Sequence, residues 1–161
     1  MSSPHRHATN QDPNMPHKAA SNLLRKGRYS QAGQVYLITM VTYQRTKVFA
    51  NFQAERILIN TLRTEERLNR ACTWTYVVMP DHVHWLMQLG EQVSLARCVQ
   101  GVKSQVSRQL GQPVWQDGFH DRAMRKEEDL QTLARYIVAN PLRAGLASRV
   151  GDYPHWDALW L

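Results

Sequence analysis

Residues 73–90 have the pattern of a β-hairpin, which limits the folds open to the chain. Two runs rich in β-branched and aromatic residues, TWTYVVM and HVHWLMQLG, flank a Pro-Asp pair typical of a turn. Successive strand side chains point to opposite faces, so His82, His84 and Gln88 share one face. The other face carries Val83, Trp85, Met87 and Leu89. The hairpin is predicted to bury this apolar face and to keep the histidine face for chemistry.

The remaining segments complete an α+β pattern. VYLITMVT at 35–42 is predicted to be a buried strand, and 114–125 a short strand or loop. Apolar residues at helical spacing predict three helices, at 53–69, 94–110 and 127–140. Pro141 is expected to end the third helix at Asn140. This order, without a glycine-rich phosphate loop, favours a ferredoxin-like α+β sandwich with a central antiparallel sheet and helices packed on it.

The second helix is predicted to have two contrasting sides. Ser94 is a suitable N-cap. An apolar stripe is formed by Leu95, Cys98, Val99, Val102 and Val106. The other faces carry Arg97, Lys103, Ser104, Ser107 and Arg108. We therefore expect an exposed side rich in basic and hydroxyl groups.

Length and charge indicate one basic domain. The chain has 161 residues, and residues 1–22 lack apolar periodicity, which predicts a flexible tail before a single domain at 23–161. His5, His7 and His17 in the tail are expected to be solvated. The net charge of +7 favours a polyanionic partner such as nucleic acid over a membrane surface.

The cysteines and the N-terminus bear on the compartment. Cys72 and Cys98 form no CxxC pattern, and both are expected to be buried thiols in a reducing cytoplasm. No apolar signal segment and no run of about 18 apolar residues is present in the sequence. These features predict a soluble cytoplasmic protein.

His82 and His84 form half of a metal site, because imidazoles at i and i+2 of a strand can share one ion. Asn140 is a candidate third ligand. It lies four residues after Tyr136, so a helix would deliver the amide and the phenol together. Simpler roles stay open: structural histidines, an interfacial tyrosine at Tyr136, and an asparagine that caps a helix end.

Tyr136 fits a nucleophile. A tyrosine hydroxyl has a pKa of about 10, so at neutral pH it needs a strong electrophile. A phosphate bound to a divalent ion is one. The predicted reaction is transesterification, in which Tyr136 attacks phosphorus and forms a phosphotyrosine. Gln88, on the histidine face, could position the substrate.

Five segments together resemble the HUH single-tyrosine transposases, and within them the IS200-like, REP-associated tyrosine transposases of prokaryotes. In chain order they are GRYSQAGQVYLITMVTYQR, WTYVVMPDHVHWLM, SLARCVQGVKSQVSRQL, VWQDGFHDRAMR and RYIVANPLRAGL. The resemblance implies a ferredoxin-like domain that nicks and rejoins single-stranded DNA at hairpins formed by palindromic repeats, with Mg²⁺ or Mn²⁺. Relatives act as monomers or as homodimers, and the sequence does not choose between them.

The resemblance also assigns residues. It implies that His82 and His84 are metal ligands, that Asn140 is the third ligand, and that Tyr136 forms a 5′-phosphotyrosine. Phe119, His120 and Asp121, in the GFHD segment, are expected near the site. The residues expected to contact DNA are Arg45, Lys103, Ser107, Arg108, Phe119, His120 and Arg122.

The chain departs from the family pattern in two places. PDH replaces the more usual PNH, so Asp81 adds a negative charge beside the histidines, and YPHW replaces YPWS near the C-terminus. Neither change removes a proposed catalytic group.

Two other functions fit the same residues. One is a non-catalytic protein that binds DNA hairpins for regulation or repeat maintenance. The other is a hydrolase that acts on RNA or small phosphoesters through metal-bound water, without Tyr136. Trp115 and Trp156 could stack on unpaired bases or lie in the core.

Overall fold

Five strands of the described chain form one antiparallel sheet. The computed structural model describes residues 30–126 and 128–158, so the tail predicted at 1–22 lies outside the described residues. The sheet has the order β4-β1-β3-β2-β5. The strands are β1 (Val35–Val41), β2 (Ala71–Met79), β3 (His82–Leu89), β4 (His120–Ala123) and β5 (Trp156–Ala158).

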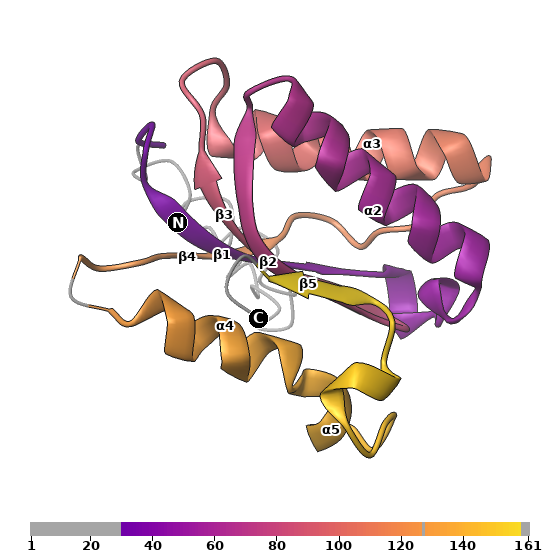
Figure 1. The fold of residues 1–161 in the computed structure, drawn as a ribbon. Coiled ribbons are helices and arrows are strands. Elements are labelled where there is room, and N and C mark those ends of the chain that lie inside the picture. The colour runs from indigo at the N-terminus through magenta and orange to yellow at the C-terminus, as the bar shows by residue number, and fades with distance from the viewer. Residues whose placement is uncertain (1–29, 127, 159–161) are drawn as a thin grey trace, which may run out of the picture.

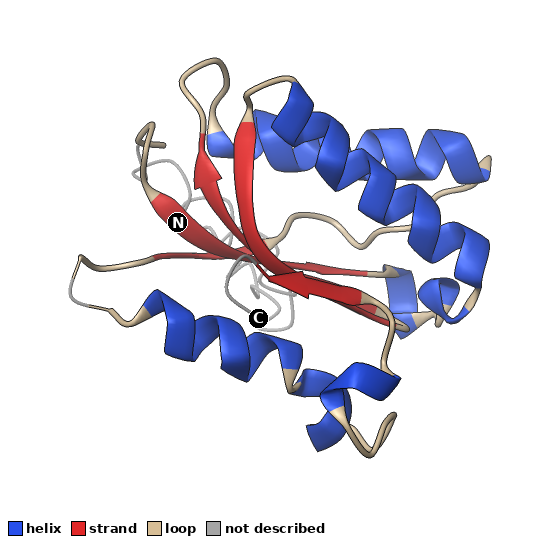
Figure 2. Ribbon diagram, in the orientation of Figure 1, coloured by secondary structure: helices blue, strands red, loops and turns tan. Residues whose placement is uncertain are grey.

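Helices lie on both faces of this sheet (Figures 1 and 2). They are α2 (Phe52–Arg67), α3 (Leu95–Leu110), α4 (Leu130–Val138) and α5 (Asn140–Arg143). The described residues also form three 3₁₀ turns, η1 (Tyr43–Arg45), η2 (Val48–Ala50) and η3 (Val150–Asp152). Helices α2 and α3 cover one face, whereas α4 lies on the other (Figure 1). No helix of the described residues is long and apolar enough to cross a membrane.

The topology confirms the predicted ferredoxin-like arrangement. β1 and β2 both pair antiparallel with β3, and β4 pairs antiparallel with β1. Two β-α-β units are thus interleaved, as in the ferredoxin-like motif. β5 adds an edge strand beside β2 that the sequence pattern had not indicated.

The predicted alternation of the hairpin is confirmed by two separate cores. Val83, Trp85, Met87 and Leu89 are buried on the α2 and α3 side, together with the whole apolar stripe of α3. Leu86 is buried on the opposite side, in a second core that also contains Ile137 of α4. The helix α3 also begins as predicted, because the Ser94 hydroxyl accepts a hydrogen bond from the Arg97 amide.

The third predicted helix ends earlier than expected. Helix α4 ends at Val138, and Pro141 lies in the first turn of a separate short helix, α5, instead of terminating α4 at Asn140. Proline is tolerated in a first helical turn because its missing N–H would have no partner there. At the other end, Asp129 is the N-cap of α4 and accepts bonds from two backbone amides, so this acidic residue precedes the helix.

The two cysteines differ in burial. Cys98 is buried as predicted, and its thiol donates to Glu65 Oε2 at 3.7 Å. The prediction for Cys72 is wrong, because this residue is exposed. It pairs with Gln88 near the end of the hairpin far from the histidines.

Candidate active site

His82 and His84 lie side by side on the sheet face that α4 covers. Their ring centroids are 4.9 Å apart, with the ring planes near perpendicular. In the neighbouring strands, Val77 and Thr39 are the register partners of His84. Both imidazoles therefore project from one strand toward the same space, as the i, i+2 spacing predicted.

Each histidine has one ring nitrogen engaged in a hydrogen bond. His82 Nδ1 donates to Asp81 Oδ1 at 2.6 Å, and His84 Nδ1 lies 2.9 Å from Thr39 Oγ1. The Asp81 carboxylate can only accept, so it selects the His82 tautomer with its proton on Nδ1 and a lone pair on Nε2; His84 takes the same tautomer when the Thr39 hydroxyl accepts. This is the arrangement in which metal-binding histidines are usually held.

Electrostatics keep His84 neutral. Its pKa is lowered to about 4, chiefly by burial and then by the charges of His82, Arg143 and Arg45. Burial acts in the opposite direction on Asp81, but its bond to His82 and the charges of His82 and Arg45 prevail, so the Asp81 pKa lies below its ordinary value. At neutral pH the site therefore contains a neutral imidazole beside a carboxylate.

Tyr136 and Asn140 meet through Arg143. The Tyr136 side chain is 60% exposed. The Arg143 guanidinium carbon lies 3.7 Å from the centre of its ring, and Arg143 Nη2 donates to Asn140 Oδ1 at 2.8 Å. Helices α4 and α5, which carry these side chains, lie on the sheet face that carries the histidine pair (Figure 1), and the charge of Arg143 contributes to the lowered pKa of His84.

Both atoms of the Asn140 amide already have partners. Oδ1 accepts from Arg143, and Nδ2 donates to the Ile137 carbonyl at 2.9 Å, near the C-terminal end of α4. The second bond supports the simpler role of a helix-end cap. Oδ1 retains a second lone pair, so a ligand role for Asn140 stays a prediction.

The side chains at this site can hold a divalent ion only if an oxygen ligand other than a carboxylate joins the two histidines. Within residues 30–126 and 128–158, no group of three or more His, Cys, Asp and Glu side chains could hold a metal. Two imidazoles with unused Nε2 atoms and one amide oxygen suit a site that leaves positions for substrate oxygens.

Comparison with known proteins decides the family. The family model described as "Transposase IS200 like" matches residues 30–140, which include His82, His84, Tyr136 and Asn140. The chain belongs to the IS200-like transposase family. A Haemophilus influenzae protein assigned as a REP-associated tyrosine transposase is 28% identical over 145 residues, covering 76% of this chain and 78% of that protein. The REP-associated tyrosine transposase of Escherichia coli is 30% identical over 82 residues, or 49% of each chain.

A solved structure shares the fold of this IS200-like protein. It is a REP-associated tyrosine transposase bound to a REP hairpin. The TM-score is 0.68 at 24% sequence identity, covering 80% of this chain and 79% of that one. The ferredoxin-like fold predicted from the sequence is thus the fold of that transposase.

The loop after β1 joins the histidine site of this IS200-like protein. Thr42, fully buried, bonds through its amide and its hydroxyl to the Asp81 carbonyl. Arg45 Nη1 lies 3.6 Å from Asp81 Oδ2, and its side chain is 62% exposed. Gln44 and Arg45 both have positive φ, 52° and 56°, which is costly for residues other than glycine. The structure therefore places Arg45 next to the site, in a strained loop.

The prediction that Lys103 lies on the exposed side of α3 is wrong. Lys103 is 6% exposed, and its Nζ donates to the carbonyls of Gln116 and Gly118 at 2.8 and 2.7 Å. The loop after α3 folds back over the lysine stem, so the ammonium group is used inside the protein. Ser107 and Arg108 do line an open groove of about 570 Å³ between α3 and this loop.

The GFHD segment places one residue in the same row as the histidine pair. His120 of β4 pairs with Thr39, which pairs with His84, so all three face the same side of the sheet. His120 is exposed. Asp121 pairs with Ile38 on the opposite side, and Phe119 is partly buried against the α2 and α3 core. Arg122 is exposed but forms an ion pair with Glu128 at 3.0 Å.

The two tryptophans left undecided by the sequence lie in the cores. Trp115 contacts Phe49, with ring centroids 5.3 Å apart, and its Nε1 donates to the Lys103 carbonyl. Trp156 packs in the second core and donates to the Val150 carbonyl. Both side chains are partly buried, and Trp115 also lines the groove beside α3.

Sequence reasoning missed three residues of the site. The contact of Thr39 with His84 can be recognised only when the register of β1 against β3 is known. Tyr43, 59% exposed, lies in the loop that holds Arg45. Arg143 had a signal, because positions 136, 140 and 143 are spaced i, i+4 and i+7, which places them on one side of a helical segment.

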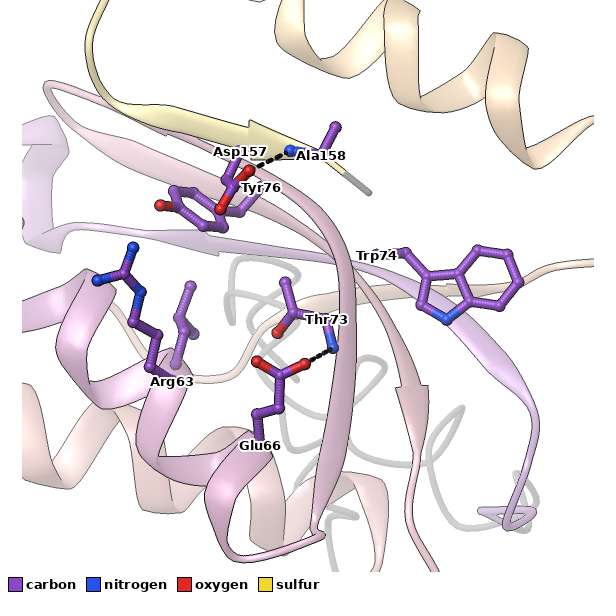
Figure 3. Close-up of a pocket in the computed structure, with 8 residues that line it drawn as sticks. Arg63, Glu66, Thr73, Trp74, Tyr76, Asp157 and Ala158 are labelled. Carbon is purple, nitrogen blue, oxygen red and sulfur yellow. Dashed lines mark hydrogen bonds between the residues drawn. The ribbon is translucent and has the colours of Figure 1, made fainter. Parts of the chain in front are cut away.

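A separate pocket lies on the α2 side of the sheet. It has a volume of about 140 Å³. Figure 3 shows Arg63, Tyr76 and Asp157 around it, and Trp74 on the other side of β2. The pKa of Tyr76 is raised to about 12, mainly by burial. This pocket is on the sheet face opposite the histidines, so it does not belong to the candidate active site.

Proposed function

We propose that this IS200-like protein nicks and rejoins single-stranded DNA at hairpin-forming palindromic repeats through a 5′-phosphotyrosine on Tyr136. The observation that carries the proposal is that a histidine pair and the linked side chains of Asn140, Arg143 and Tyr136 lie on the same side of the sheet.

The proposed step balances as a transesterification. The Tyr136 Oη atom bonds to phosphorus and the bond from phosphorus to the 3′ oxygen breaks. The phenol proton leaves to solvent, and the departing 3′ oxygen takes up a proton as a hydroxyl group. Since a phosphodiester is exchanged for another, the released 3′ hydroxyl can attack the phosphotyrosine and restore the strand.

The residues present fit Mg²⁺ or Mn²⁺. His82 and His84 would hold the ion through Nε2, and Asn140 Oδ1 is the proposed third ligand. When bound, the ion would neutralise charge on the scissile phosphate and polarise it. Asp81 and Thr39 orient the two imidazoles through hydrogen bonds to their Nδ1 atoms.

Charge and similarity support a hairpin as the partner. The net charge of +7 suits a polyanion, and the protein in the solved structure of the same fold is bound to a REP hairpin. The cytoplasm, where prokaryotic DNA is accessible, is the compartment we propose.

Incubation with labelled DNA tests the proposal. We expect hairpin oligonucleotides with single-stranded flanks, taken from repeated palindromes of the source genome, to give a covalent protein–DNA adduct with Mn²⁺. EDTA should abolish this adduct, because the phosphate then lacks its neutralising ion. Denaturing gels measure the adduct, and native gels measure binding.

The same gels separate the alternatives. A hairpin that shifts on native gels but is never cleaved with Mg²⁺ or Mn²⁺ would identify a binding protein. Cleavage with repeated turnover and no covalent species would identify a hydrolase. Either result would contradict the proposed transesterification.

The loop that carries Arg45 is our proposed contact for the unpaired strand. Tyr43 and Arg45 are both exposed, and the loop is fixed to Asp81, the partner of His82. An aromatic ring can stack on an unpaired base, and a guanidinium can contact phosphate. The strained backbone of Gln44 and Arg45 is the kind of conformation that persists where surrounding contacts hold it.

Tyr43→Ala is expected to weaken binding of a hairpin with single-stranded flanks by about 5- to 150-fold, because stacking on one base contributes about 1–3 kcal/mol. Tyr43→Phe keeps the ring and should bind like the unmodified protein. Leu68→Ala is the control, since Leu68 is also an exposed apolar residue, 45% exposed, but follows α2 at the opposite end of the hairpin. Fluorescence anisotropy measures Kd. Equal affinities for Tyr43→Ala and Leu68→Ala would exclude the stacking role.

A further inference from the structure

Arg143 makes three contacts with the residues around the proposed nucleophile. Its guanidinium carbon is 3.7 Å from the centre of the Tyr136 ring. Its Nη2 atom donates to the Tyr136 main-chain carbonyl at 2.7 Å and to Asn140 Oδ1 at 2.8 Å. One guanidinium therefore touches the ring of the nucleophile, its backbone and the amide of the proposed third ligand.

The break between α4 and α5 brings Arg143 into this position. Helix α4 ends at Val138, and the buried Pro141 lies in the first turn of α5, whose last residue is Arg143. The side chain returns from α5 to the carbonyl of Tyr136, seven residues earlier. The short helix thus supplies a clamp for the end of the preceding one.

The Tyr136 side chain needs such a restraint. At 60% exposure, a tyrosine on a helix surface is surrounded mainly by solvent. Unrestrained, it would sample several rotamers, and a reacting group that is misplaced by about 1 Å can lose about 100-fold in rate. A planar guanidinium against the ring face restricts these rotamers and is attracted to the ring electrons.

We propose that Arg143 is a positioning residue that holds the Tyr136 phenol and the Asn140 amide in a fixed relation before DNA binds. This inference rests on the function proposed above. This positioning needs the planar, multiply donating group of arginine, which lysine lacks.

Single-turnover cleavage measures the positioning role. With saturating hairpin DNA and Mn²⁺, Arg143→Met is expected to lower the rate of adduct formation by about 10- to 100-fold. Arg143→Lys should lower the rate nearly as much, because it keeps the charge without the planar group. Arg67→Met is the matched control, since Arg67 ends α2, near the end of the hairpin remote from the histidines, and bonds locally to Thr64. The hairpin Kd, measured in EDTA, should change by less than about threefold in all three.

A second readout follows the Tyr136 ring itself. In protein labelled with fluorotyrosine, the fluorine resonance of Tyr136, assigned through Tyr136→Phe, should shift and narrow in Arg143→Met. It should stay in place in Arg67→Met. This signal reports on the ring without DNA, metal or activity, so it tests the contact even if the unmodified protein forms no adduct and the proposed function fails.

Three results would overturn the proposal. An unchanged Tyr136 resonance in Arg143→Met would show that the contact does not restrain the ring. An Arg143→Met protein with a normal saturating rate but a weakened Kd would make Arg143 a DNA contact instead. Full activity of Arg143→Lys would show that charge alone suffices.

Discussion

Tyr136→Phe is expected to eliminate the covalent protein–DNA adduct while leaving the protein folded and able to bind hairpins. The variant lacks the Oη atom that would bond to phosphorus, so adduct formation should fall by at least about 10³-fold. Because the side chain is 60% exposed and the ring remains to pack against Arg143, stability should change by less than about 0.5 kcal/mol. Denaturing gels measure the adduct, and anisotropy measures the hairpin Kd.

Tyr43→Phe provides a matched control for this result. Tyr43 is 59% exposed and lies in the loop that contacts Asp81, so both substitutions remove one hydroxyl from an exposed tyrosine. Only the change at Tyr136 should remove the adduct. An adduct that persists in Tyr136→Phe would mean that another side chain is the nucleophile, and multiple turnovers in that variant would favour hydrolysis by water.

The regular elements of the fold could be predicted because their patterns are local. Two-residue alternation places His82 and His84 opposite Trp85, and the structure keeps that division along β3, whereas β2 has a register shift between Thr73 and Thr75. The stripe on α3 is likewise a property of one helix. In both cases the apolar side chains must be buried, and this determines which way the polar side chains of the same element face.

The predictions that were wrong concern residues whose burial or conformation depends on other parts of the chain. Lys103 follows a stripe residue on α3, and the sequence of α3 does not show that the loop of Gln116 and Gly118 will cover it. A lysine stem can be buried if its ammonium group finds carbonyl acceptors. The break after Val138 is similar, since a proline is compatible with either a helix end or a new helix start.

The residues of the candidate active site were partly predictable for the same reason. His82, His84, Tyr136 and Asn140 were proposed from spacing and from resemblance to the family, and the structure places the helices that carry Tyr136 and Asn140 on the sheet face of the histidines. Thr39 could not, because its relation to His84 depends on the pairing of β1 with β3. The spacing of a motif thus identifies groups on one element, whereas their supporting contacts come from the fold.

Gly90→Ala is expected to destabilise the protein strongly, because the end of β3 approaches another backbone segment too closely for a side chain. A Cβ at this position would lie 2.2 Å from the Asn69 carbonyl oxygen and 3.0 Å from two Arg70 backbone atoms. The Gly90 amide also donates to the Arg70 carbonyl at 2.9 Å, which fixes the approach. Since backbone must move, we expect a loss of about 3 kcal/mol or more and a fall in Tm of about 6–12 °C.

Gly101→Ala tests whether the effect belongs to the close approach rather than to any loss of glycine. Gly101 lies within α3, and a Cβ there would meet no atom within 4 Å. The change should stabilise the protein by about 0.5–1 kcal/mol, since alanine favours helix over glycine. Thermal unfolding compares the two variants, and equal melting temperatures would contradict the argument. Gly90 lies at the end of the hairpin opposite His82. The Gly90→Ala protein should therefore still form the adduct at temperatures where it is folded. This result would separate the stability of the hairpin from the reaction proposed for its histidine end.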